Sequence, residues 1–489
     1  MNPTDEQAAA ADAFHAGNHL ALQAGAGTGK TTTLALLARS TAHRGRYLAY
    51  NRAIADDART HFPATVTCKT AHALAYAAVG HRYTRRLNSP RRPAWRTGCD
   101  LGLTDSLRIG DRDISQRTLS NAALRTVTRF CHTAERTIGH HHVPRLRGLD
   151  DPDHHAELSE FLVPFARKAW RDLQYVDEGV VRFDHDHYLK IWALTQPRIE
   201  ADFLLLDEAQ DTNPVVEQVF LAQRDHAQLV MVGDSAQAIY HWRGARDVMT
   251  GFDGTRLTLT QSFRFGPRLA TEANRWLALA DAPLRLTGTD TIATELGPVI
   301  RPDAVLCRTN VGAMAQVMQL MSAGLRVALA GGGQGLQALA SAARDLKQGR
   351  RAHHPELLLF TAWHDLQEYA AYDPHGRDLQ PFVDLVDTHG PDAILAAVAR
   401  LVPEDTAQVT VSTAHKAKGR EWASVRIAGD FEPPAPDSPS DEQSDTRQID
   451  LSEARLAYVA VTRTRQRLDL GGLSWVTDQT AATARRETA

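Results

Sequence analysis

The segment AGAGTGKTT (24–32) has glycines, a lysine and hydroxyl side chains where an apolar stretch gives way to a helical pattern. Successive backbone N–H groups of such a loop converge on phosphate oxygens, and the following helix N-terminus adds partial positive charge. Lys30 would reach the β- and γ-phosphates of a nucleotide, and the Thr31 hydroxyl would ligate Mg²⁺. The plainer alternative is a glycine turn before an ordinary helix. The predicted phosphate loop comprises Ala24, Gly25, Ala26, Gly27, Thr28, Gly29, Lys30, Thr31 and Thr32.

A second group of candidate residues follows the apolar run 203–206 in FLLLDEAQD. Two adjacent carboxylates at the end of a buried strand are costly unless a cation uses them. Asp207 suits a Mg²⁺ contact, and Glu208 suits the base that polarises an attacking water. The alternative for an isolated Asp-Glu pair is a solvated turn or a helix start. Together with the phosphate loop, the pair predicts nucleoside triphosphate hydrolysis.

Composition excludes several other classes of protein. The 55 basic and 58 acidic residues give a net charge of −3, so the chain does not grip nucleic acid by bulk charge, and phosphate binding must be local. The four cysteines lie far apart without zinc-site spacing, which favours reduced thiols of an intracellular protein. The acidic N-terminus does not resemble a secretory signal, and no uncharged apolar run has bilayer length. We therefore expect a soluble, cytoplasmic protein without a membrane partner.

Four further segments resemble, in order, the motifs of superfamily 1 DNA helicases of the UvrD/Rep type. They are GDSAQAIYHWRGA (233–245), LTQSFR (259–264), VSTAHKAKGREW (411–422) and YVAVTRTR (458–465). The phosphate loop with its leading alanine is also the form that this family uses. The early segments AYNRAIADDA (49–58) and CKTAHALAY (68–76) look most like the F-box DNA helicase branch.

The resemblance implies roles for residues outside the phosphate loop. Gln7 would read adenine, and its amide can both donate to and accept from one base edge. Gln237 would sense the γ-phosphate, and Glu421 would contact the ribose. Arg463 would act as an arginine finger from a second core, so that hydrolysis requires the two cores to close. The arginines expected near the nucleotide are Arg243, Arg264 and Arg463, and the residues expected to be catalytic are Lys30, Asp207, Glu208, Gln237, Arg264 and Arg463.

The chain departs from the family pattern at two positions. Arg420 stands where the family usually has leucine after KG, and Thr464 stands where it usually has alanine after TR. Each of these two substitutions lies next to a residue with an implied role, Glu421 or Arg463. They could therefore change the local geometry of Glu421 and Arg463.

For DNA, the resemblance implies a base-stacking platform at Trp242, with Tyr240 close by, because aromatic faces suit single-stranded bases. For an isolated Tyr-His-Trp sequence the alternative is core packing. The remaining DNA-track positions carry polar groups suited to the sugar-phosphate backbone, which carries no sequence information. These positions are Tyr50, Asn51, Thr70, His72, Thr413 and His415.

Strand-length apolar runs alternate with helical stretches, which is typical of parallel strands buried on both faces. They occur at 19–24, 47–50, 203–206, 229–232, 304–307 and 425–428. We predict an α/β fold with two RecA-like P-loop NTPase cores and helical insertions. The predicted limits are 1–85 with 188–253 for the first core, 86–187 for its insertion, 254–333 with 404–489 for the second core, and 334–403 for its short insertion.

Three local features complete the sequence-based expectations. The helical pattern that begins at Leu158 is expected to be interrupted by Pro164. The Pro- and acid-rich segment 432–445 is expected to be a mobile surface loop. The histidine clusters at 140–142, 185–187 and 353–354 are expected to be chance neighbours, because the sequence offers no matching ligand set for a metal other than Mg²⁺.

The resulting hypothesis is an ATP-dependent DNA helicase or translocase that moves 3′ to 5′ on single-stranded DNA, in DNA repair, recombination or replication. Its cofactors would be ATP and Mg²⁺, and its partners single-stranded DNA and tailed duplex DNA. One alternative is an ATP-gated DNA-binding or remodelling protein with little unwinding; the intact Glu208 and Arg463 disfavour it, and the short second insertion leaves it open. The other is a small-molecule NTPase or kinase, which leaves the later motifs unexplained.

Overall fold

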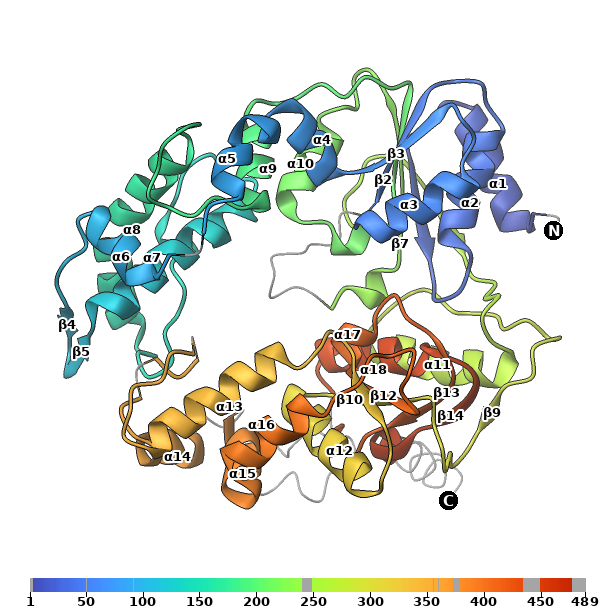
Figure 1. The fold of residues 1–489 in the computed structure, drawn as a ribbon. Coiled ribbons are helices and arrows are strands. Elements are labelled where there is room, and N and C mark those ends of the chain that lie inside the picture. The colour runs from blue at the N-terminus through green and yellow to red at the C-terminus, as the bar shows by residue number, and fades with distance from the viewer. Residues whose placement is uncertain are drawn as a thin grey trace. The chain divides into compact units, whose positions relative to one another are not determined.

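The computed structural model of the 489-residue chain describes residues 3–49, 51–90, 92–239, 249–354, 356–358, 360–372, 379–433 and 449–476 (Figure 1). Tyr50, Tyr240, Trp242 and Arg243 lie outside the described residues, as does most of the predicted loop at 432–445. Backbone packing divides the chain into two compact units. Unit 1 comprises 1–23, 30–233 and 240–258, and unit 2 comprises 24–29, 234–239 and 259–489.

The first sheet has six strands in the order β3-β2-β6-β7-β1-β8. The pairs β3–β2, β2–β6, β6–β7 and β7–β1 are parallel. All four residues of β6 are buried, which explains its uninterrupted apolar sequence. The strands are β1 (Leu20–Ala24), β2 (Gly45–Ala49), β3 (Val66–Thr70), β6 (Phe203–Leu206), β7 (Gln228–Gly233) and β8 (Thr255–Leu259).

Short helices connect these strands and place their N-termini at the carboxyl ends of the strands. The turn after β1 leads directly into α2, and Asn51 and Thr70 cap α3 and α4. Ligands of open parallel sheets bind at this edge. The helices are α1 (Asp5–His15), α2 (Lys30–Arg39), α3 (Arg52–His61), α4 (Ala71–Ala78) and α10 (Pro214–Leu221), with 3₁₀ turns η3 (Ala209–Asp211) and η4 (Ser235–Gln237).

The region between β3 and β6 is mainly helical and contains one antiparallel hairpin (Figure 1). Its helices bury a continuous apolar cluster that reaches the helices beside the first sheet. The elements are η1 (Gly80–Tyr83), α5 (Thr84–Leu87), α6 (Ala94–Asp100), β4 (Leu107–Ile109), β5 (Arg112–Ile114), α7 (Gln116–Cys131), η2 (His140–His142), α8 (Pro152–Leu173) and α9 (His185–Leu194).

The expected interruption at Pro164 was wrong, because α8 continues through this residue. A proline inside a helix costs about 3 kcal/mol through its missing N–H group and its clash with the preceding turn. Leu158, Leu162 and Leu173 are fully buried on one face of α8, and each such side chain contributes about 1.5–3 kcal/mol by burial. Tertiary packing therefore outweighs the local cost of the proline.

The second sheet also has six strands, in the order β11-β12-β10-β13-β14-β9, and all of its neighbouring strands run parallel. β12 and β10 are adjacent interior strands and are buried along their whole length. The strands are β9 (Glu295–Leu296), β10 (Ala304–Cys307), β11 (Val327–Leu329), β12 (Val409–Thr413), β13 (Trp422–Ile427) and β14 (Thr464–Asp469).

Helices of unit 2 form a second apolar cluster with β10, β11 and β12. The helices of unit 2 are α11 (Pro267–Leu279), α12 (Asn310–Ser322), α13 (Gln334–Lys347), α14 (Trp363–Tyr372), α15 (Gln380–His389), α16 (Pro391–Ala399), α17 (Ala414–Ala417) and α18 (Leu451–Val461), followed by the turn η8 (Gly471–Leu473). Those that contribute to the cluster are α12 to α16. The two parallel sheets confirm the predicted α/β fold class with two RecA-like cores. We retain the predicted limits of the cores and insertions as a proposal.

Arg86 ties α5 to the C-terminal end of α8. Its guanidinium donates to the backbone oxygens of Asp172, Tyr175 and Val181, and to the Asp172 carboxylate at 3.0 Å. The same carboxylate accepts the N–H groups of Val180 and Val181, both at 2.9 Å. This ion pair, with the Arg86 side chain 5% and the Asp172 side chain 16% exposed, is largely buried and closes the loop that follows α8.

Replacing Arg86 with methionine should lower the free energy of unfolding by about 3–5 kcal/mol, because it leaves the Asp172 charge buried and its neighbouring carbonyl groups without donors. The matched control is Arg85→Met, since Arg85 is an exposed neighbour on the same helix. Denaturant unfolding of both variants measures the effect. Equal stability of the two variants would contradict the anchoring role.

Candidate active site

The phosphate loop adopts a backbone that only glycine tolerates at two positions. Gly27 and Gly29 both have φ of +75°, in the left-handed region. A Cβ atom at Gly27 would also lie 2.6 Å from the Ser262 hydroxyl oxygen and 2.6 Å from Arg264 Cβ. The Thr28 hydroxyl closes the turn by donating to the Gly25 carbonyl oxygen at 3.0 Å. The loop then enters α2 at Lys30, which directs its first N–H groups toward one point.

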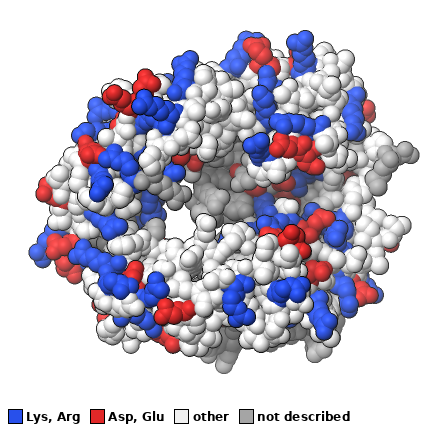
Figure 2. All heavy atoms as spheres, in the orientation of Figure 1, with Lys and Arg blue, Asp and Glu red and all other residues white. Residues whose placement is uncertain are grey.

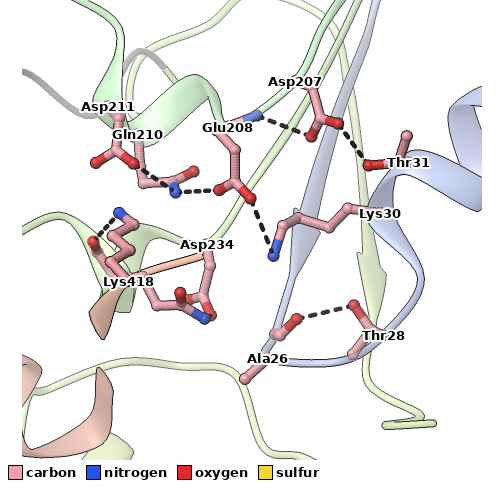
Figure 3. A network of polar contacts seen from close by, with 12 residues as sticks. Ala26, Thr28, Lys30, Thr31, Asp207, Glu208, Gln210, Asp211, Asp234 and Lys418 are labelled. Atoms are coloured by element: carbon pink, nitrogen blue, oxygen red, sulfur yellow. Dashed lines mark hydrogen bonds and ion pairs between the residues drawn. The ribbon is translucent and has the colours of Figure 1, made fainter. Parts of the chain in front are cut away.

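Asp207 lies directly after β6, and its carboxylate accepts two short hydroxyl hydrogen bonds. Thr31 Oγ1 donates to Asp207 Oδ2 at 2.6 Å, and the Tyr47 hydroxyl donates to the same oxygen at 2.7 Å. Figure 3 shows the Thr31 contact beside Lys30 and Glu208. Burial, followed by the charge of Glu208, raises the pKa of Asp207. The side-chain oxygens of Thr31 and Asp207 are hard ligands of the kind that Mg²⁺ prefers, so these two residues fit this cation.

Glu208 is held in position by its backbone and by two side chains. Its φ of +52° is uncommon for a residue other than glycine, and such local strain is concentrated at functional sites. Gln210 Nε2 donates to Glu208 Oε2 at 2.6 Å, and Lys30 Nζ lies 4.0 Å from Glu208 Oε1 (Figure 3). The carboxylate stays partly accessible, with 30% of its side chain exposed. It can therefore accept a proton from water beside the phosphate-binding loop.

A buried hydrogen-bond network in unit 2 joins the phosphate-loop turn to α18. The Tyr458 hydroxyl accepts the Ala26 N–H at 3.0 Å and donates to Asp234 Oδ2 at 2.9 Å. Gln237 Nε2 donates to the same carboxylate oxygen at 2.7 Å. The side chain of Arg463, 2% exposed, lies with NH2 at 3.4 Å from Gln237 Oε1. Gln237 and Arg463 are thus brought together, while the roles of Tyr458 and Asp234 were not predicted.

Arg264 and Glu421 form an ion pair. Arg264 Nε donates to Glu421 Oε2 at 2.8 Å, and Arg264 NH1 donates to the Thr462 carbonyl oxygen at 3.0 Å. Arg465 NH1 lies 3.7 Å from the other oxygen of Glu421. The substituted residue Arg420 pairs with Glu404 and not with Glu421. This glutamate, which the resemblance assigns to ribose, is positioned by arginines on both sides.

Gln7 forms the capping box of α1 with Thr4 and also reaches α2. Its N–H donates to Thr4 Oγ1 at 3.2 Å, its Oε1 accepts the Thr4 N–H at 3.1 Å, and its Nε2 donates to Thr33 Oγ1 at 3.0 Å. The structure therefore fixes the amide against the helix that follows the phosphate loop. Contact with adenine would use the remaining amide hydrogen and lone pair.

The described DNA-track candidates follow one local pattern. Asn51, Thr70 and Thr413 are N-caps of helices that follow β2, β3 and β12, and each side-chain oxygen accepts a backbone N–H. His72 lies one residue inside α4, and its Nε2 is 3.0 Å from Asp186 Oδ1. His415 occupies the corresponding place in α17 and is partly buried.

Asp186 also holds His132, whose Nε2 lies 3.0 Å from its second oxygen. Although burial alone would raise it, hydrogen bonds from His132 and His72 hold the pKa of Asp186 well below its usual range. The carboxylate is therefore charged at neutral pH and fixes the orientation of the His72 ring. No motif in the sequence indicated this link between α4, α7 and α9.

One histidine cluster does assemble three potential metal ligands. Among the described residues, Glu135, His141 and His142 place one ligand atom each within 4.8 Å of one another. However, His142 Nδ1 accepts the Gly139 N–H at 3.0 Å, and its Nε2 faces the Thr133 hydroxyl at 3.1 Å. Because both of its nitrogens have protein partners, the group functions as a hydrogen-bonded cluster.

Tyr47, Tyr458 and Asp234 are residues of the site that sequence reasoning missed. Tyr47 reaches Asp207 only because β2 pairs with β6, 160 residues away along the chain. Tyr458 stands in the motif YVAVTRTR, yet its partners Ala26 and Asp234 are specified by the packing of α18. In the sequence, a tyrosine whose hydroxyl pairs with a buried carboxylate cannot be distinguished from a tyrosine that only packs in the core.

Two family models match the chain in tandem. An AAA domain model matches residues 6–243, which include the phosphate loop and Asp207. A UvrD-like helicase C-terminal domain model matches residues 385–472, which include Tyr458 and Arg463. Together with the F-box DNA helicase relatives described next, the two matches support a UvrD-like superfamily 1 helicase. This confirms the family that the ordered motifs predicted.

Curated relatives place the chain near the F-box DNA helicase branch of this family. F-box DNA helicase protein 1 of Schizosaccharomyces pombe is 28% identical, over 93% of this chain and 55% of the relative. F-box DNA helicase 1 of Gallus gallus is 34% identical, over 52% of this chain and 25% of the relative. The ATP-dependent DNA helicase UvrD2 of Mycobacterium bovis is 26% identical, over 55% of this chain and 47% of the relative. The chain thus spans about half or less of these relatives.

Two solved helicase structures are more distant. A PRRSV helicase is 14% identical, with 56% of this chain and 36% of that chain covered at a TM-score of 0.24. A structure of Pif1 helicases at forked double-stranded DNA is 13% identical, with 65% of this chain and 57% of that chain covered at 0.27. The assignment of the fold class rests on the two parallel sheets.

Replacing Glu208 with glutamine should leave nucleotide binding intact and reduce hydrolysis by about 100-fold or more, because the amide keeps the shape but cannot act as a base. Lys30→Ala should instead weaken binding and hydrolysis together, since it removes the phosphate-facing ammonium. Nucleotide-binding titrations and single-turnover hydrolysis separate the two variants. Loss of nucleotide binding in Glu208→Gln would assign Glu208 a structural role.

Replacing Tyr458 with phenylalanine should reduce kcat for ATP hydrolysis by more than it changes KM. The change leaves the Ala26 N–H and one Asp234 lone pair buried without this partner, at about 1–3 kcal/mol per group. Tyr83→Phe is the matched control, because it removes a hydroxyl that donates to the Gln174 carbonyl oxygen at 3.0 Å in the helical region. If both variants lose stability equally and both keep full turnover, Tyr458 only supports the fold.

Proposed function

We propose that this chain is an ATP-dependent DNA helicase or translocase that moves 3′ to 5′ on single-stranded DNA. The observation that carries the proposal is the joint placement of Thr31 with Asp207 and of Lys30 with Glu208, at 2.6 and 4.0 Å. The match to the UvrD-like helicase C-terminal domain supports the DNA substrate, and the names of the curated relatives support helicase activity. The polarity and a role in repair, recombination or replication rest on the family resemblance.

In the proposed reaction, the phosphate loop and Lys30 hold the triphosphate of ATP, while Glu208 orients and deprotonates the attacking water. Thr31 and Asp207 would hold Mg²⁺, which neutralises charge on the phosphates when bound. Arg463 and Gln237 would stabilise the charge that develops on the γ-phosphate. Gln7, Arg243, Arg264 and Glu421 remain proposed nucleotide contacts.

The proposed DNA track uses local chemistry and no broad electrostatic field. Figure 2 shows Lys and Arg interspersed with Asp and Glu over the visible face, in keeping with the net charge of −3. Phosphate contacts would come from the caps at Asn51, Thr70 and Thr413 and from His72 and His415. Tyr50, Tyr240 and Trp242 would add contacts to bases or backbone.

Two alternatives predict different solution behaviour. A small-molecule NTPase or kinase would be indifferent to DNA. An ATP-gated DNA-binding protein would respond to DNA but separate few strands, and the short region 334–403 favours this second candidate. Within the described part of the chain, no helix combines the length and hydropathy needed to cross a bilayer. A cytoplasmic location remains a proposal.

Single-stranded DNA of mixed sequence should stimulate ATP hydrolysis by about tenfold or more. The stimulation should fall as the salt concentration rises, because phosphate contacts release counterions. Strand displacement should proceed on a 3′-tailed duplex and not on a 5′-tailed one. The Glu208→Gln variant is the control for contaminating activity. Hydrolysis that ignores DNA at low salt would favour the small-molecule NTPase, and stimulation without displacement would favour the DNA-binding alternative.

A further inference from the structure

An open pocket of about 640 Å³ lies in the helical region, away from the phosphate loop in sequence. It is formed by α7, the loop that contains η2, and the first turns of α8. None of the described residues that line it is an aspartate or glutamate. Its ionisable lining residues are Arg125, Arg129, Arg145, His140, His141 and His155.

The positive charge of this pocket is poorly compensated by the protein. Arg129 donates to the backbone oxygens of Val143 and His141, at 3.4 and 3.2 Å, and not to a carboxylate. Burial, followed by the charge of Arg125, lowers the pKa of Arg129. Within the described residues, neither Arg125 nor Arg145 forms an ion pair. Arg125 therefore repels Arg129, and an anion between these exposed guanidinium groups would offset that repulsion.

His155 provides a separate observation. Its Nδ1 atom is buried and has no hydrogen-bond partner among the described residues, while its Nε2 lies 3.5 Å from the Ser159 hydroxyl. Burial, followed by the charges of Arg145 and Arg129, lowers its pKa. A buried polar atom without a partner usually marks a missing ligand or water. The ring stands in the first turns of α8, where the helix dipole also favours negative charge.

The nearby carboxylates are already engaged. Glu135 Oε1 lies 2.8 Å from His141 Nε2, and Asp151 Oδ1 accepts the Asp153 N–H at 2.8 Å as the N-cap of α8. A metal cation would have to enter among three guanidinium groups, so the charge of the pocket opposes it. Planar guanidinium forks instead match the oxygens of a phosphate group.

We propose that this pocket binds a phosphate group of a DNA strand, as a contact separate from the predicted single-strand track. The proposal rests on the proposed DNA-dependent function and adds a binding site to it. Arg125 and Arg145 would supply the bidentate contacts, and Arg129 would hold the loop that carries His141. Because only phosphate oxygens are contacted, this site would be insensitive to base sequence.

The test compares DNA binding by two charge-matched double variants. Arg125→Gln/Arg145→Gln alters the pocket, while Arg108→Gln/Arg171→Gln removes two exposed arginines elsewhere in the same region. Fluorescence anisotropy with a 3′-tailed duplex at several salt concentrations gives affinity and salt dependence. The pocket variant should bind about tenfold more weakly, with a salt slope reduced by about 1 to 2, and the control should bind like the parent.

Inorganic phosphate distinguishes a free anion from DNA as the ligand. If phosphate raises the melting temperature of the parent but not of the pocket variant, and DNA affinity is equal in both, the pocket binds a free anion and the proposal is overturned. Equal DNA affinity and salt slope in parent and pocket variant without such an effect also overturn it. If the double variant melts early, the single variant Arg145→Gln and the charge-conserving Arg125→Lys/Arg145→Lys replace it, with the latter expected to recover part of the affinity.

DNA-stimulated ATP hydrolysis separates this proposal from the proposed function. A parent protein whose hydrolysis ignores DNA shows that the proposed function fails. A parent that is stimulated by DNA, with a pocket variant of unchanged affinity, shows that only the pocket assignment fails. Basal hydrolysis without DNA should be the same in all variants, because none of the altered residues contacts the phosphate loop.

Discussion

A carboxylate buried at the end of a strand must be matched by donors or by a cation, and Asp207 imposes this requirement on the first sheet. Its side chain is only 3% exposed, and burial raises its pKa. Thr31 and Tyr47 supply two hydroxyl donors to the same oxygen. Two hydroxyls do not fully replace water around a charge, so the remaining cost favours a bound divalent cation. The position of Thr31 at the start of α2 therefore links the phosphate loop to β6.

The same solution recurs at Asp234, which follows the neighbouring strand β7. This carboxylate is fully buried and accepts hydrogen bonds from the Tyr458 hydroxyl, the Gln237 amide and the Ala236 N–H. Burial raises the pKa values of both Tyr458 and Tyr47, so each phenol keeps its proton and remains a donor. Each tyrosine thus fixes one carboxylate beside the loop that would hold phosphate. The difference is that Tyr458 also engages the loop backbone through Ala26.

Much of the fold could be predicted from the sequence because its signals are local. Uninterrupted apolar runs indicate buried parallel strands, and the glycine spacing at Gly27 and Gly29 indicates a left-handed turn. The partners of Asp207 could not be predicted, because strand order decides which side chains meet. The continuation of α8 through Pro164 was missed for a related reason. The sequence shows the local cost of the proline, but it does not show the tertiary packing of the helix face whose burial outweighs that cost. The pocket at Arg125 and Arg145 likewise depends on which helices pack together.

The helix caps explain how the proposed DNA track could ignore sequence. The side-chain oxygens of Asn51, Thr70 and Thr413 each accept a backbone N–H from the first turn of the helix that follows the strand. Each oxygen is then oriented by the helix, while the other N–H groups of the first turn have no partner within the helix itself. Such groups suit phosphate oxygens and do not distinguish bases, so these caps would hold the backbone of any strand. Discrimination between DNA structures would then require contacts outside these caps, such as the proposed phosphate site at Arg125 and Arg145.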